Sequence, residues 1–181
     1  MEDTDLERCK PEWQALIEED LRWLGVTWDG PVYRQAPRIG GYNAHLDGLA
    51  AQGLLYPCSC SRGDIRAALA APQEGVTHSV YPGTCRGRPM ADRRAGDALR
   101  LDLDRALARP EVRAACFTET SPAHAGVHRI NPETARQQIG DVVLSRKGEN
   151  IVAYFLASAF DDADQGITHV IRGEDLFDFT P

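Results

Sequence analysis

Apolar side chains recur at helical spacing in two stretches near the start of the chain. In residues 11–24 the apolar positions are three or four residues apart, which predicts a helix with one apolar face. These positions are Trp13, Leu16, Ile17, Leu21 and Leu24. Pro11 suits a first turn and Gly25 a helix end. Residues 38–52 repeat the helical pattern and stop at Gly53, so we expect a second helix there.

Shorter apolar runs predict strands farther along. Residues 99–103 alternate apolar and polar side chains, as expected of a half-buried strand. Residues 141–146 and 167–171 are two further expected strands. The apolar segment 151–160 has no periodicity that decides between strand and helix. Strands alternating with helices favour an α/β fold.

A third pattern marks the middle of the chain. Ser61 and Asp64 have the spacing of a capping box, which predicts a helix through about residue 70. Residues 71–98 are rich in Gly, Pro and Arg, so we expect an irregular loop that something other than an apolar core holds in place.

Composition limits the class of protein. The 181 residues, 43% apolar and 26% charged, suit one soluble domain or one domain with a sizeable insertion. No apolar run approaches the roughly 20 residues that span a membrane, and the first residues are acidic rather than a signal peptide. We therefore expect a cytoplasmic protein with no membrane partner.

The net charge of −7 argues against a protein that coats nucleic-acid phosphates without regard to sequence. A local basic run remains, and a solvated loop explains it as well as a binding surface does. The run consists of Arg86, Arg88, Arg93 and Arg94.

Cysteine spacing suggests a metal site. The chain has five cysteines, an odd number that argues against a disulfide framework. Cys58, Cys60 and Cys85 could supply three thiolates to a structural zinc ion. The fourth ligand could be His78 or Tyr81, and chemistry alone favours His78 because imidazole is the commoner ligand. The alternative is three reduced cysteines that pack as small apolar side chains.

Three local motifs combine along the chain. Glu-Asp-Thr-Asp at residues 2–5 precedes the first expected helix. Tyr-Pro-Cys-Ser-Cys at residues 56–60 is followed by Tyr-Pro-Gly-Thr-Cys-Arg at residues 81–86. Gly-Asp-Val-Val-Leu at residues 140–144 leads to Gly-Ile-Thr-His-Val-Ile-Arg-Gly-Glu-Asp-Leu at residues 166–176. Together these motifs resemble the glutamyl-tRNA synthetase family. The Cys-x-Cys and Tyr-x-x-x-Cys spacing looks like that of its glutamyl-queuosine tRNA(Asp) synthetase branch.

This resemblance implies a fold and a ligand set. The fold is α/β, a class I synthetase Rossmann-like parallel sheet with an inserted zinc-knuckle subdomain. Residues 1–55 and 100–181 would form part of the Rossmann-like core, and residues 56–99 the zinc-binding insertion. The family places a tyrosine four residues before the last cysteine, which moves the expected fourth ligand from His78 to Tyr81. The implied zinc ligands are Cys58, Cys60, Tyr81 and Cys85.

The resemblance also implies an activity. Glutamate and ATP, with Mg²⁺, would give glutamyl-adenylate, and the glutamyl group would pass to queuosine in the anticodon of tRNA(Asp). The expected partners are therefore L-glutamate, ATP and tRNA(Asp), bound by a monomer. No side chain is assigned as catalytic, because such steps rest on positioning and on cations.

Three residues match the family's glutamate-binding positions. Glu2 would hold the substrate ammonium, and the guanidinium of Arg172 would hold a carboxylate with two hydrogen bonds from the end of a strand. Tyr154 would turn its hydroxyl toward the substrate. The other interpretations are a disordered acidic segment for Glu2, a surface ion pair with Glu174 or Asp175 for Arg172, and a core position for Tyr154. We expect Asp161 and Asp162 to cap a loop rather than act as acid and base.

Two ATP-binding signatures of the family, of the His-x-Gly-His and Lys-Met-Ser-Lys-Ser types, do not occur in the sequence. We therefore expect these 181 residues to be a fragment, so catalysis by this chain alone is an open question. One alternative is a non-catalytic zinc-stabilised module that binds tRNA or a protein through its arginine run. A second is the catalytic core of a glutamate–tRNA ligase, which the lack of a helical anticodon domain in this sequence disfavours.

Overall fold

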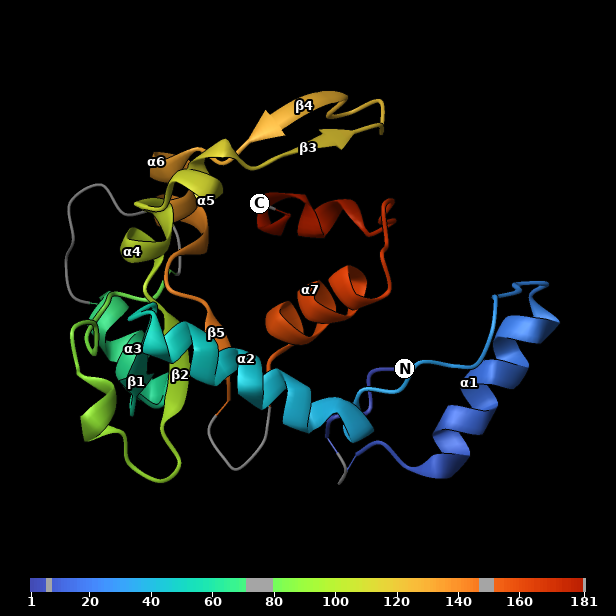
Figure 1. The fold of residues 1–181 in the computed structure, drawn as a ribbon, viewed down its shortest axis with the longest axis horizontal. Coiled ribbons are helices and arrows are strands. Elements are labelled where there is room, and N and C mark those ends of the chain that lie inside the picture. The colour runs from blue at the N-terminus through green and yellow to red at the C-terminus, as the bar shows by residue number, and fades with distance from the viewer. Residues whose placement is uncertain (6–7, 71–79, 147–151, 181) are drawn as a thin grey trace.

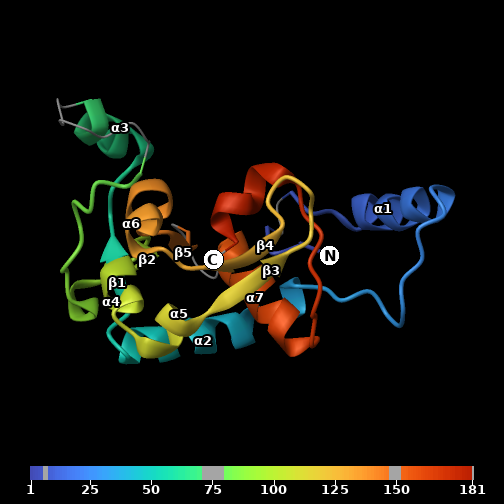
Figure 2. The ribbon, with the colours of Figure 1, turned by 90° about the horizontal axis from the view of Figure 1, so that it is seen from above.

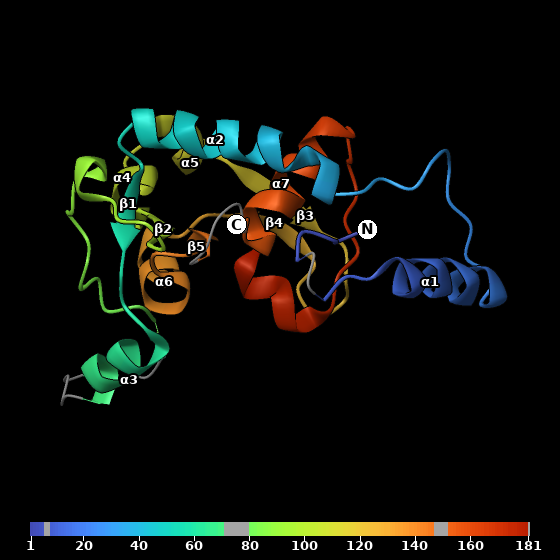
Figure 3. The ribbon, with the colours of Figure 1, turned by 90° about the horizontal axis from the view of Figure 1, so that it is seen from below.

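A computed structural model describes residues 1–5, 8–70, 80–146 and 152–180. The main sheet and the helices packed on it lie toward one end of the molecule, and one helix projects at the other end (Figure 1). The views from above and below show the same projection (Figures 2 and 3).

The main sheet has three antiparallel strands, β1 (Leu55–Cys58), β2 (Ala98–Leu101) and β5 (Val143–Ser145), in the order β1-β2-β5. β1 and β2 pair from Leu55 opposite Leu101 to Cys58 opposite Ala98. The expectation of a parallel sheet is therefore wrong for the strands described. After β1 the chain returns beside the same strand, so no helical crossover is needed of the kind that joins parallel strands. The strands expected at residues 99–103 and 141–146 are confirmed in part, as β2 and β5.

Helix α2 (Ile39–Ala51) covers this sheet and confirms the second predicted helix. Its Leu46 is buried against Leu55, Leu99 and Leu144, which come one from each strand. In α2, apolar positions of the helical pattern such as Leu46 and Leu49 therefore pack in the core.

Helix α7 (Tyr154–Asp164) settles the segment whose periodicity was ambiguous. Tyr42 of α2 is fully buried against Ala157 of α7 and Val152, and its ring meets Phe160 edge-on at 5.4 Å. This contact fixes α7 beside α2 (Figure 1).

Helix α1 (Pro11–Trp23) confirms the first predicted helix but has no buried residue. Its apolar face is exposed: Trp13 keeps 53% of its surface in solvent and Trp23 keeps 83%. α1 is the helix that projects in Figures 1 to 3.

The remaining elements are short. Helix α3 (Arg62–Ala70) begins at the predicted capping box. A two-stranded antiparallel hairpin consists of β3 (Cys116–Glu119) and β4 (Gly126–Arg129). The other helices and helical turns are η1 (Ala36–Arg38), η2 (Met90–Asp92), α4 (Leu103–Leu107), α5 (Pro110–Ala114), α6 (Pro132–Thr134), η3 (Ala135–Ile139) and η4 (Glu174–Phe179).

The strand expected at residues 167–171 is wrong. This segment follows Gly166, whose φ of 64° turns the chain after α7, and it is not paired with any strand of the described chain. Ile171 is 98% exposed, and Val170 and Ile171 border a cavity. The apolar pattern that suggested a buried strand therefore belongs to an exposed segment.

Candidate functional site

One cavity brings together all three residues that the sequence suggested for glutamate binding. The cavity has a volume of about 610 Å³, and Glu2, Tyr154 and Arg172 all line it. They come from the N-terminal segment, the start of α7 and the segment after α7, so only the fold makes them neighbours. The remaining walls come from α1 and from residues 26–35.

The N-terminal segment is held in place by hydrogen bonds. The buried carboxylate of Asp3 accepts hydrogen bonds from the backbone N–H groups of Gln35 and Ala36, at 2.9 and 2.8 Å. The Nε2 of Gln14 in α1 donates to the same carboxylate at 3.2 Å. These contacts fix the backbone next to Glu2, whose side chain is exposed at the cavity wall.

One face of α7 forms a wall of the cavity. Tyr154, Ser158, Asp161 and Gln165 line it, and their spacing of three or four residues puts them on the same side of a helix. The ring of Tyr154 is half-buried, with its centroid 6.0 Å from that of Phe155. Sequence reasoning missed Ser158 and Gln165. Helical spacing from Tyr154 could have found them if the segment had been assigned as a helix.

Arg172 is exposed and its Nη2 donates to Oγ1 of Thr180 at 3.1 Å. Among the described contacts it has no ion pair with Glu174 or Asp175, and Glu174 instead lies 3.1 Å from Nε2 of His124. The guanidinium thus keeps donors for a ligand. Arg172 lies in the unpaired segment after α7, not at the tip of a strand as expected.

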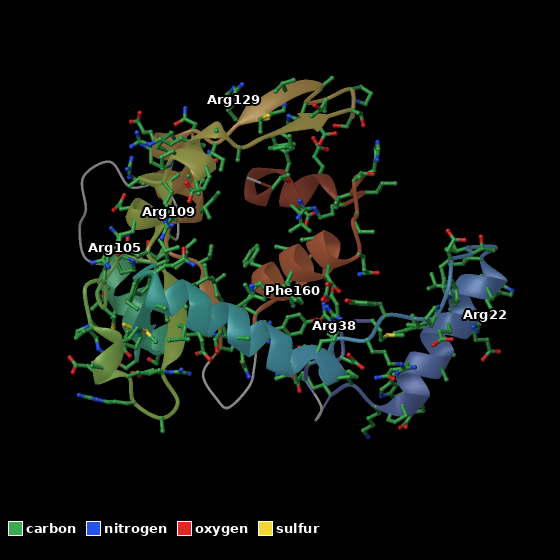
Figure 4. All side chains as sticks on the ribbon, viewed as in Figure 1. Arg22, Arg38, Arg105, Arg109, Arg129 and Phe160 are labelled. Carbon is green, nitrogen blue, oxygen red and sulfur yellow. The ribbon has the colours of Figure 1, made fainter. Side chains whose placement is uncertain are left out.

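Asp161 is a buried residue of α7, so the expectation that it caps a loop is wrong. Its carboxylate accepts hydrogen bonds from Tyr42 Oη at 2.8 Å, Gln35 Nε2 at 2.9 Å and Arg38 Nε at 3.3 Å. Burial, and then Asp161 itself, raises the pKa of Tyr42 well above its usual value. Figure 4 shows Arg38 and Phe160 where α2 meets α7, and the guanidinium lies 5.4 Å from the centre of that ring.

The second site is the thiol cluster of Cys58, Cys60 and Cys85, whose sulfur atoms lie within 4.8 Å of one another. Cys58 ends β1, and a turn at Gly83 with φ of 78° precedes Cys85. Sulfur atoms around a tetrahedral zinc ion, each about 2.3 Å from it, are about 3.8 Å apart. The observed Cys60–Cys85 sulfur separation of 3.5 Å fits such an ion.

Tyr81 lies beside this cluster. Its Oη lies 3.4 Å from the sulfur of Cys58 and 3.6 Å from that of Cys60, and it accepts a hydrogen bond from the N–H of Cys85 at 2.8 Å. The guanidinium of Arg100 stacks 3.7 Å from the centre of the Tyr81 ring. The other proposed ligand, His78, lies outside the described residues.

The thiols differ in acidity. Burial raises the pKa of Cys60 to about 11. Burial acts the same way on Cys85, but the hydrogen bonds from Tyr81 and from the backbone of Ser59 outweigh it and lower the pKa of Cys85 to about 6. Burial raises the pKa of Tyr81 as well, so its hydroxyl stays protonated unless a cation lies beside it. The cluster therefore carries thiolate character at neutral pH, which suits a soft cation.

The basic run is partly committed to ion pairs. Arg86 contacts Asp141 at 2.8 Å and Asp104 at 2.9 Å, and Arg88 contacts Asp97 at 3.0 Å. Two of its four arginines thus stabilise the loop, which weakens the case for a module that binds RNA through this run.

Comparison with known proteins places the chain in a family. Residues 1–181 match the family described as tRNA synthetases class I (E and Q), catalytic domain, so the chain belongs to the class I aminoacyl-tRNA synthetases of that group. A curated relative from Rhodobacter capsulatus, named Glutamyl-Q tRNA(Asp) synthetase, is 50% identical over 99% of this chain and 65% of its own length. A relative of the same name from Thiobacillus denitrificans is 38% identical over 100% of this chain and 54% of its own length. The chain thus spans between about half and two thirds of these relatives.

Solved structures support the fold. A glutamate tRNA ligase from Elizabethkingia meningosepticum, crystallised in complex with its amino acid, superposes with a TM-score of 0.66 at 25% identity over 97% of this chain and 36% of its own. The glutamate-tRNA synthetase of Elizabethkingia anophelis gives a TM-score of 0.69 at 24% identity. The α/β class I synthetase-like fold expected from the sequence is thereby shown. In the part of the chain that is described, no helix is both long and apolar enough to cross a membrane.

Proposed function

We propose that this chain forms the amino-acid-binding part of an enzyme that activates L-glutamate with ATP and transfers it to queuosine in the anticodon of tRNA(Asp). The observation that carries the proposal is the shared cavity of Glu2, Tyr154 and Arg172. An acid and an arginine in one cavity match the opposite charges of an amino acid that has an acidic side chain.

Each of the three residues has a role in binding. The carboxylate of Glu2 pairs with the substrate ammonium, and the guanidinium of Arg172 holds a substrate carboxylate by two parallel hydrogen bonds. The hydroxyl of Tyr154 donates to a substrate oxygen. Together they orient the α-carboxylate, which attacks the α-phosphorus of ATP, so that the adenylyl group is transferred and pyrophosphate leaves. Bound Mg²⁺ would neutralise the charge that develops on the phosphates.

The thiol cluster holds one zinc ion in a structural role. We assign Cys58, Cys60, Tyr81 and Cys85 as its ligands, because their sulfur and oxygen atoms lie close together. The role is structural because four protein ligands leave no open position on the ion for chemistry. The insertion of residues 56–99 depends on this ion for its fold, while residues 1–55 and 100–181 belong to the core.

Calorimetry with L-glutamate tests the proposed site. Arg172→Met keeps the aliphatic stem and removes the charge, so glutamate affinity should fall about tenfold or more. Arg109→Met, which removes an arginine outside the cavity lining, is the matched control and should bind like the wild type. Equal affinity in wild type and Arg172→Met would remove Arg172 from the site.

Activity is tested by glutamate-dependent exchange of pyrophosphate into ATP, measured on the full reading frame that contains this chain. The acceptor is tested separately, by offering tRNA(Asp) with and without queuosine. Transfer that requires queuosine supports the proposal. Transfer to the 3′ end of a glutamate tRNA would instead favour a glutamate–tRNA ligase core.

A further inference from the structure

Gln35 joins two walls of the cavity. Its side-chain Nε2 donates to Oδ2 of Asp161 in α7 at 2.9 Å, and its backbone N–H donates to Oδ1 of Asp3 at 2.9 Å. Gln35 is 7% exposed, Asp3 4% and Asp161 6%, so water competes little for these bonds. Asp3 directly follows Glu2, and Asp161 is seven residues after Tyr154 on the same helix face.

The carboxylate of Asp161 has two further donors beside Gln35. Tyr42 Oη and Arg38 Nε donate to its Oδ1 at 2.8 and 3.3 Å. The charge of Arg38 compensates that of the buried acid. Both carboxylate oxygens of Asp161 therefore accept hydrogen bonds from the protein, so we treat it as an anchor for Gln35.

We propose that Gln35 and Asp161 are positioning residues that fix the carboxylate of Glu2 relative to the hydroxyl of Tyr154. This inference rests on the proposed function, since it assigns Glu2 to the substrate ammonium. The path from Asp161 through Gln35 and Asp3 is a buried hydrogen-bonded link from α7 to the segment that carries Glu2. A second, more exposed link runs from Asp164 of α7 through Tyr33 to the amino group of Met1. Without the buried link, only the exposed one of these two, through Tyr33, holds α7 to the N-terminal segment, so the position of Glu2 loosens and the ammonium contact weakens before the carboxylate contact does.

The test compares L-glutamate with glutarate, the same diacid without the amino group, by calorimetry on the full chain. Gln35→Leu keeps the size of the side chain and removes its donor. It should lower the preference for glutamate over glutarate about tenfold, with little change in glutarate affinity. Glu2→Gln should cause the same loss, and the double variant should lose no more than either single variant.

Equal weakening of both ligands in Gln35→Leu would mean a general structural role, and an unchanged preference would mean no role. Either result overturns the proposal. Asp161→Asn keeps the shape of the side chain and replaces a charged acceptor with a neutral one. It should lower the preference for glutamate over glutarate in the same way, to a smaller extent. This variant provides the test if Gln35→Leu does not fold.

Amide hydrogen exchange separates this proposal from the proposed function, because it needs no ligand. In Gln35→Leu the amides of residues 35 and 36, which donate to Asp3, should exchange several-fold faster than in the wild type. The matched control is Gln52→Leu, which makes the same replacement at an exposed glutamine whose Nε2 donates to the carbonyl of Gly48 within α2, at 3.1 Å. Unchanged exchange in Gln35→Leu overturns the link. If exchange is faster in Gln35→Leu but the wild type does not bind glutamate, the link is supported and the proposed binding function is refuted.

Discussion

The buried carboxylate of Asp141 accepts a hydrogen bond from the hydroxyl of Tyr56, a residue 85 positions earlier in the chain. Asp141 is 1% exposed and also accepts from Arg86 Nε at 2.8 Å and from the N–H of Leu103 at 3.1 Å. It thus joins strand β1, the loop of the thiol cluster and the start of α4. Burial, and then Asp141, raises the pKa of Tyr56 far above its usual value, so the phenol is a permanent donor.

Tyr56→Phe removes this donor while the ring stays in place. We expect the free energy of unfolding to fall by about 1–3 kcal/mol, because a buried carboxylate loses one of its partners. Urea denaturation measures the change. Tyr33→Phe also deletes a hydroxyl bound to an aspartate, Asp164, but at an exposed site, and should lower the free energy of unfolding much less. Equal losses would show that Asp141 does not depend on Tyr56.

The thiol cluster should bind about one zinc ion per chain. Cys85→Ala should abolish binding, because it removes one of the three thiols, the one whose pKa the neighbouring hydrogen bonds lower to about 6. Tyr81→Phe keeps the ring and removes only Oη, so we expect weaker binding in a chelator competition and a lower midpoint of thermal unfolding. His78→Ala should bind zinc normally. Normal binding by Tyr81→Phe with loss in His78→Ala would make histidine the fourth ligand.

Asp97 should make part of the stability depend on pH. The backbone N–H of Arg94, followed by the guanidinium of Arg88, lowers the pKa of Asp97 below its ordinary value of 3.8. Because the folded state binds this proton less readily than the unfolded state, the contribution is fully present well above pH 3.8 and is lost as the pH falls through the lower folded value. The difference in free energy of unfolding between wild type and Asp97→Asn should therefore be constant above about pH 5 and shrink below it. A constant difference down to pH 2 would contradict this assignment.

Helix α3 should depend on its capping box. Ser61 N–H donates to Asp64 at 2.7 Å, and the N–H of Asp64 donates to Ser61 Oγ at 3.1 Å. Ser61→Ala should destabilise the helix by about 0.5–2 kcal/mol, measured as faster hydrogen exchange of the α3 amides. Thr120→Ala, in the exposed turn of the β3–β4 hairpin, is the control and should leave those amides unchanged.

Local patterns in the sequence predicted local structure. Helices α1 and α2, the capping box at Ser61 and strand β2 each follow from spacing or hydrogen-bonding groups within one segment. The spacing of Cys58, Cys60 and Cys85 likewise predicted three sulfur atoms that now lie together. In the helices, the capping box and the strand, the interacting residues are close in sequence. The three cysteines are farther apart, but thiols with this spacing are typical of a metal site.

What the sequence could not predict depends on distant partners. The direction of strand pairing is set by the route of the chain between strands, so the expected parallel sheet was wrong. Val170 and Ile171 have the composition of a buried strand, yet no described strand pairs with them. Gln35 and Asp161 are 126 positions apart, and nothing in either segment indicates the other. Only the resemblance to known synthetases grouped Glu2, Tyr154 and Arg172.

Because Cys58 pairs with Ala98 in neighbouring antiparallel strands, the chain leaves the sheet and re-enters it at almost the same point. The length of the segment between these two residues does not affect the geometry of the sheet. Closing a longer loop costs little extra entropy. A change in the length of this segment should therefore leave the pairing of β1 with β2 intact. In the described part of the segment, the shape is held by the sulfur cluster and by ion pairs, some of which reach residues outside it such as Asp141.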